Sequence, residues 1–235
     1  MRRTVRLERS ACRRVDGWLT AGDDATGPTN DLGNNDRERS SVRVIRFAEP
    51  DPFEPGPISD VQVLEYVYPD AAHNAETLLA DAVSNTVVIV TKEQSANSVG
   101  PAELGRTEPA FVFEGSLDPA ADGPVELVLV GTLDMPTLES RTELSPSHPV
   151  AIFGAAGVAT AGDIAVDGTM IALRTYESVW LWQRGANQTV VEALTSEPCE
   201  VGAAFERQGE AVAFDGDGLA TLGEGVRQPI NLLGK

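Results

Sequence analysis

Three carboxylates hold similar places in three short stretches of the chain, and together they could bind a cation. Residues 74–79, 161–166 and 208–213 each contain small residues, then one carboxylate, then an apolar run typical of a β-strand. The carboxylates are Glu76, Asp163 and Glu210. Oxygen ligands of this kind suit Ca²⁺, or Mg²⁺ with retained water. Without a cation or basic group among them, three adjacent carboxylates repel one another and titrate as a coupled set.

Three further residues lie where they could assist such a site. Asn74 could add a carbonyl ligand, and His73 could accept a proton. Arg174 could neutralise the carboxylates, bind an anionic ligand or form a salt bridge between sheets. A second interpretation needs no metal, because acidic side chains at strand starts also accept backbone N–H groups from a neighbouring sheet. The sequence leaves both interpretations open.

The three stretches predict a repeated unit of four β-strands. From residue 41 onward, short β-type runs alternate with turn signals at a spacing typical of a sandwich, barrel or propeller. The last unit is one strand short, and in propellers the N-terminus commonly supplies that strand. The expected strands after each stretch, and the two before the first, are 42–47, 61–67, 86–91, 110–113, 125–130, 170–176, 179–182, 189–194, 219–222 and 229–233.

Several of these runs are apolar on both faces, which favours a β-propeller, because each blade is covered by its neighbours. Trp180 and Trp182 are expected in the core. The innermost strand of each blade lines the central channel, so Glu76, Asp163 and Glu210 are predicted to converge at the channel mouth. Residues 136–144 are a candidate helix between blades. Residues 75–83 could also form a short helix, but the repeat favours a strand there.

Composition sets wider limits. A chain of 235 residues with a net charge of −18 fits one acidic domain and argues against nucleic-acid binding. Residues 1–46 carry a net charge of +3, so we divide the chain into an atypical N-terminal segment, 1–40, loosely ordered or an eroded blade, and a propeller domain, 41–235. No apolar run is long enough for a membrane span, and no signal peptide is recognisable.

Other signatures are scarce. Cys12 and Cys199 lie far apart and do not indicate a disulfide framework. Nucleophile-elbow, phosphate-loop and zinc-protease motifs are absent from the sequence. Residues 215–218 read Asp-Gly-Asp-Gly and lack the full spacing of a calcium loop, which favours a tight hairpin turn.

The repeated stretches resemble blade-opening sequences of uncharacterised bacterial β-propeller proteins, frequent in actinobacteria. The resemblance is carried by residues 68–79, 160–168 with 172–176, and 208–214. It implies about five blades and no settled activity. Those proteins have a further leading blade, and they differ from this chain at 15–19 and 31–35. We therefore expect four to five blades, incomplete at the N-terminus; a lost leading segment would make an extracytoplasmic location possible.

Two functions follow as hypotheses. The first is a monomeric binding scaffold with a carboxylate-lined channel that takes a small-molecule or protein ligand at its mouth. The alternative is a calcium-dependent hydrolase, similar in layout to propeller lactonases, esterases or phytases. In that case Ca²⁺ held by Glu76, Asp163 and Glu210 would activate water, and His73 would be the general base.

Overall fold

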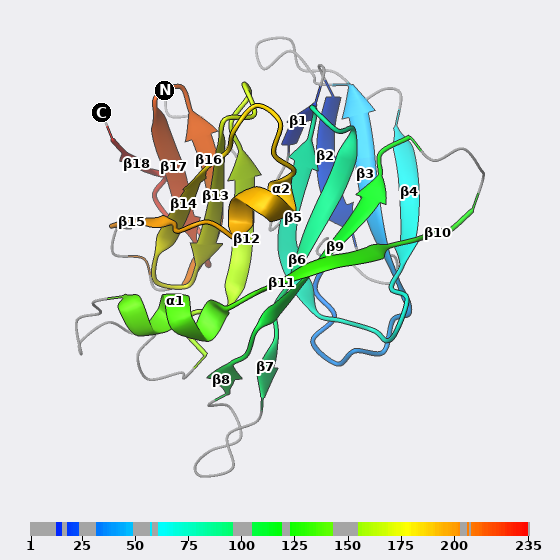
Figure 1. Cartoon of the computed structure of the whole chain (residues 1–235), viewed down its shortest axis with the longest axis horizontal. Coiled ribbons are helices and arrows are strands. Elements are labelled where there is room, and N and C mark those ends of the chain that lie inside the picture. The colour runs from blue at the N-terminus through cyan, green and yellow to red at the C-terminus, as the bar shows by residue number, and fades with distance from the viewer. Residues whose placement is uncertain are drawn as a thin grey trace.

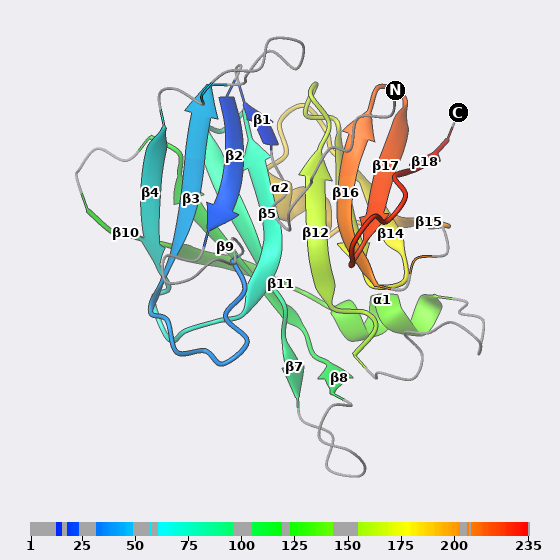
Figure 2. The same cartoon turned by 180° about the vertical axis from the view of Figure 1, so that it is seen from behind.

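The computed structural model describes residues 13–15, 18–23, 32–48, 57, 61–95, 105–118, 123–142, 155–202, 206 and 208–234. They form a mostly β structure with four larger sheets and one two-stranded hairpin (Figures 1 and 2). None of the helices in these ranges is long and apolar enough to cross a membrane.

The first sheet contains five strands in the order β1-β2-β3-β4-β10, of which only the β4–β10 pair is parallel. β2 pairs with β3, although the two strands lie on either side of the boundary that we placed between residues 40 and 41. The strands are β1 (Arg13–Val15), β2 (Trp18–Asp23), β3 (Ser41–Ala48), β4 (Gln62–Val67) and β10 (Val125–Glu126).

The second sheet is antiparallel in the order β11-β9-β6-β5. A small hairpin, β7 (Gln94–Ser95) with β8 (Arg106–Thr107), extends from it. The predicted strand 125–130 is divided between two sheets, because β10 pairs with β4 and β11 pairs with β9. The four strands are β5 (Ala75–Asp81), β6 (Thr86–Thr91), β9 (Ala110–Ser116) and β11 (Val128–Leu133).

The third and fourth sheets follow the same antiparallel pattern. The third consists of β12 (Ala159–Ile164), β13 (Met170–Thr175), β14 (Val179–Gln183) and β15 (Cys199–Val201). The fourth consists of β16 (Gly209–Asp215), β17 (Gly218–Gly223) and β18 (Asn231–Leu233). Among the described strands none completes the fourth sheet, and β1 pairs with β2 instead.

The sheets stand side by side with their first strands facing inward, as blades do in a propeller. β12 packs between β5 and β16, and β1 and β2 contact β5 (Figure 2). The described sheets form an open row with the first and fourth at its ends, and not a closed ring (Figure 1). The prediction is thus confirmed for a mostly β chain whose sheets pack side by side, while the propeller, its closure and the number of blades stay predictions.

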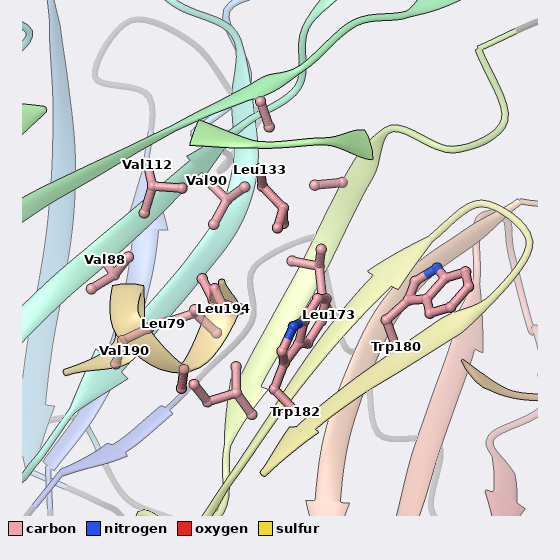
Figure 3. Close-up of a cluster of buried hydrophobic side chains, with 14 of the residues drawn as sticks. Leu79, Val88, Val90, Val112, Leu133, Leu173, Trp180, Trp182, Val190 and Leu194 are labelled. Carbon is pink, nitrogen blue, oxygen red and sulfur yellow. The ribbon is translucent and has the colours of Figure 1, made fainter. Parts of the chain in front are cut away.

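The largest core lies between the second and third sheets (Figure 3). Trp180 and Trp182 are fully buried in it, as expected, with Leu79 and Leu173 among their companions. β5, β6, β12 and β13 have buried side chains on both faces. This double burial explains why their sequences do not alternate between apolar and polar residues.

Two helices cover the edges of this core. α1 (Met135–Arg141) confirms the helix predicted at 136–144 and buries Met135 and Leu138. α2 (Val190–Leu194) corrects a prediction, because residues 189–194 were expected to form a strand. Thr189 caps the amide of Glu192, and Glu192 caps the amide of Thr189. This reciprocal capping box outweighs the β-propensity of the two valines.

Residues 215–218 form the expected hairpin turn. Asp215 pairs with Gly218 at the end of the β16–β17 ladder. Gly216 has a φ of 59°, a conformation that glycine adopts without strain.

Candidate functional site

The starts of β5, β12 and β16 share a local irregularity that sets the direction of one side chain. The pairing ladders skip Glu76, Thr160 and Glu210, so each strand has a β-bulge near its start. A bulge re-aims the side chain of its extra residue. Glu76 and Glu210 are therefore equivalent, as predicted. The equivalence of Asp163 is wrong, because Thr160 takes that place and Asp163 lies three residues further along β12.

Asp163 has a structural role between sheets. Its Oδ2 accepts a hydrogen bond of 2.6 Å from the backbone N–H of Phe214, and the side chain is buried. Asp163 lies on β12 and Phe214 on β16, so this bond joins the third sheet to the fourth. For this carboxylate, the structure supports the metal-free interpretation of an acidic side chain that bonds a neighbouring sheet.

Glu76 belongs to a polar cluster at the end of the sheets where β5 begins. Lys92 donates from Nζ to Glu76 Oε2 at 2.7 Å and to the Tyr176 hydroxyl at 2.6 Å. Lys92 directly follows β6, Glu76 is in β5 and Tyr176 directly follows β13, so the second and third sheets both contribute. The Lys92 side chain is 7% exposed and that of Glu76 is 18% exposed, so the cluster lies just below the surface.

Glu210 adds a second carboxylate to this cluster, from β16 in the fourth sheet. Burial alone would lower the pKa of Lys92, but the charge of Glu76, with Tyr176 and Glu210, outweighs that effect and raises the pKa. Burial also raises the pKa of the Tyr176 hydroxyl, and Glu76 and Glu210 add to the rise. At neutral pH the cluster therefore holds a charged ammonium and a neutral phenol. We call Glu76, Lys92, Tyr176 and Glu210 the inner-strand cluster.

Arg174 forms the salt bridge between sheets that was one of its three predicted roles. Its Nη2 lies 3.0 Å from Glu206 Oε2, and both residues are buried. Glu206 Oε1 also accepts hydrogen bonds from Thr221 and Asn231, so Arg174 of the third sheet is tied to the fourth. Burial lowers the pKa of Arg174, while Glu206 and Glu210 act in the opposite direction.

The backbone at Gly209 makes room for this pair. A Cβ atom at Gly209 would overlap two guanidinium nitrogens of Arg174, so a side chain there would displace the guanidinium. Arg174 Nε and Nη1 have no hydrogen-bond partner among the described residues. The predicted binding of an anion by Arg174 stays a prediction.

His73 and Asn74 lie beside the inner-strand cluster, and their polar groups are engaged. His73 Nδ1 lies 2.8 Å from Glu93 Oε1, and Nε2 lies 3.2 Å from Asp70 Oδ1. Glu93 is in turn 2.5 Å from Arg37. The ring packs against aromatic side chains, which are Tyr68, Phe111 and Phe113.

Asn74 ties the second sheet to the loop before β3. Its Oδ1 accepts from the Asn34 backbone N–H at 2.8 Å, and its Nδ2 donates to Asn35 at 2.9 Å. The carbonyl that was a candidate metal ligand accepts the backbone N–H of Lys92 at 2.7 Å. These bonds give both His73 and Asn74 a structural role, and the catalytic role of His73 and the ligand-binding role of Asn74 stay predictions.

The residues that the structure describes contain no group of three or more His, Cys, Asp or Glu side chains that could hold a metal ion. Between Glu76 and Glu210 the positive charge comes from the Lys92 ammonium. Calcium binding by Glu76, Asp163 and Glu210 therefore stays a prediction that the side-chain geometry does not favour.

Sequence reasoning missed Lys92, Tyr176 and Glu206. Lys92 is one of only two lysines in the chain, and it follows an apolar strand directly, which was a usable signal. Tyr176 lies at the equivalent end of the next sheet, two residues after Arg174. Nothing in the sequence around Glu206 indicated its role, because its partners Arg174, Thr221 and Asn231 are distant along the chain.

No family model and no curated protein matches the chain. Among solved structures, the chain is similar to the β-propeller domain of Cps50 (Swd1) from Myceliophteria thermophila. The two are 13% identical with a TM-score of 0.33, and the match covers 92% of this chain and 66% of that chain, just under two thirds of its length.

Proposed function

We propose that this chain is a binding protein that takes up a small polar ligand at the inner-strand cluster. The observation that carries the proposal is convergence: the second, third and fourth sheets bring carboxylate, ammonium and phenol groups to one place near the surface. A few convergent polar groups on a rigid scaffold are typical of small-ligand sites. Together they can both donate to and accept from a ligand with hydroxyl or amine groups.

Binding fits these side chains better than catalysis. Lys92 is paired and its pKa is raised, so it holds its proton and is a poor nucleophile or base. Both ring nitrogens of His73 are bonded to carboxylates of this chain, Glu93 and Asp70, as is typical of a histidine with a structural role. The calcium-dependent hydrolase has no comparable support.

A thermal-shift screen tests the proposal. The probes are defined sets of sugars, polyols, primary amines and amino acids, each at millimolar concentration. A ligand that binds only the folded protein raises the melting temperature by mass action. We expect at least one set to do so with the unaltered protein, and the rise to be lost with Glu76→Gln.

Glu126→Gln is the matched control, because Glu126 is an exposed carboxylate on β10 of the first sheet, outside the cluster. This variant should keep the full response. The proposal fails if no probe set raises the melting temperature, or if Glu76→Gln responds as the unaltered protein does.

A further inference from the structure

A second group of carboxylates, Glu139, Glu177 and Glu200, lies outside the inner-strand cluster. Tyr176 and Glu177 are consecutive residues in the turn between β13 and β14. Tyr176 is bonded to Lys92, whereas Glu177 is close enough to Glu139 of α1 and Glu200 of β15 for their charges to raise its pKa. Two hydrogen bonds of Ser178 hold these elements together, one to Glu200 and one of 3.3 Å with Thr142 after α1.

Glu177 is the least satisfied carboxylate of this group. The residue is only 7% exposed, and its Oε1 has no hydrogen-bond partner among the described residues. By contrast, Glu139 accepts the backbone N–H of Gly157 at 3.1 Å, and Glu200 accepts the hydroxyl of Ser178. A buried carboxyl oxygen without a donor costs free energy, so an external donor would bind there favourably.

Positive charge is also missing from this group. In the described part of the chain, no ion pair reaches Glu139, Glu177 or Glu200. The arginine of α1, Arg141, pairs with Glu197 at 2.8 Å and lies over the Trp180 ring. Burial together with Glu139 and Glu200 raises the pKa of Glu177 to about 7, as expected for uncompensated negative charge.

What Glu177 lacks indicates the kind of cation. The described residues contain no group of three or more His, Cys, Asp or Glu side chains that could hold a metal ion. A guanidinium or primary ammonium group carries several N–H donors, so it can supply the donor that Glu177 Oε1 lacks and bond a second carboxylate at the same time. We propose that Glu177, with Glu139 and Glu200, binds an organic cation of this class.

The test uses two small probes of similar shape. N-acetyl-L-argininamide carries a guanidinium, and N-acetyl-L-citrullinamide replaces it with an uncharged urea. Calorimetry and amide chemical shifts of Gly157 and Ser178 follow binding to the full chain. We expect saturable binding of the arginine probe, weaker by about tenfold or more for the citrulline probe.

Variants separate this site from the inner-strand cluster. Glu177→Gln should weaken binding of the arginine probe by about tenfold or more, whereas Glu76→Gln and Glu126→Gln should leave it unchanged. Near neutral pH, binding should release protons, because a nearby cation lowers the pKa of Glu177. The fraction released is measured by repeating the calorimetry in buffers of different ionisation enthalpy.

Three results would overturn the proposal. They are no saturable binding up to tens of millimolar, equal binding of the two probes, and an unchanged affinity in Glu177→Gln. Misfolding is a small concern for that variant, because glutamine keeps the shape of the side chain and removes the buried charge.

Discussion

Buried charged side chains are fully hydrogen-bonded at one end of the inner strands and incompletely hydrogen-bonded at the other. At the far end of β5, Asp81 forms a two-pronged ion pair with Arg184, with distances of 2.9 and 2.8 Å. Val83 N–H and the Ser84 hydroxyl complete the bonding of Asp81. At the near end, Arg174 and Glu177 both keep polar atoms without a partner among the described residues. A fully bonded ion pair indicates a structural role, whereas incomplete bonding leaves capacity for a ligand.

Of the changes predicted here, removal of one partner of the Asp81–Arg184 ion pair should cause the largest loss of stability. Asp81→Asn or Arg184→Met leaves a buried charge unpaired between the second and third sheets, which should cost about 3–5 kcal/mol of the free energy of unfolding. Denaturant unfolding measures this loss. The double variant should lose less than the sum of the two single losses. A single loss below about 1 kcal/mol would mean that this end is not held by the pair.

At the near end, Glu177 should have a smaller effect on stability, and this effect should depend on pH. The pKa of Glu177 is raised from 4.5 to about 7 in the folded protein, with burial as the main cause and Glu139 and Glu200 as further causes. Between these values the folded state holds more protons than the unfolded state. The contribution of Glu177 to stability is therefore complete below about pH 4.5 and is lost as the pH rises to about 7.

Glu177→Gln should remove this dependence. At pH 8 the variant should be more stable than the unaltered protein by roughly 2 kcal/mol, and near pH 4 the two should be similar. Denaturant unfolding at several pH values gives the difference. A constant difference across this range would show that Glu177 does not titrate with a raised pKa.

The smallest expected effect concerns calcium. Since Lys92 supplies the positive charge beside Glu76, millimolar Ca²⁺ should change the melting temperature by less than about 1 °C. Asp163→Asn should lower the melting temperature, because it weakens the bond to Phe214, without altering the response to calcium. A calcium-dependent rise that disappears in Glu76→Gln would instead favour the hydrolase alternative.

The errors in the sequence-based predictions have local physical causes. The strand predicted at residues 189–194 is the helix α2, and the Thr189–Glu192 capping box was visible in the sequence. The placement of Asp163 had no such signal. The bulge of β12 lies at Thr160, three residues before Asp163, and the pattern of small residue and carboxylate does not show where the bulge lies.

The sequence by itself determined the local features of this protein. The doubly apolar runs predicted strands buried on both faces, and the repeated stretches identified β5, β12 and β16 as equivalent strands that begin successive sheets. Only the tertiary structure decided which charges meet. Lys92 joins Glu76 and Tyr176, and Arg174 joins Glu206, across sheets that are far apart along the chain. Such contacts depend on how whole sheets pack and on where each bulge turns a side chain, and short-range sequence patterns carry neither.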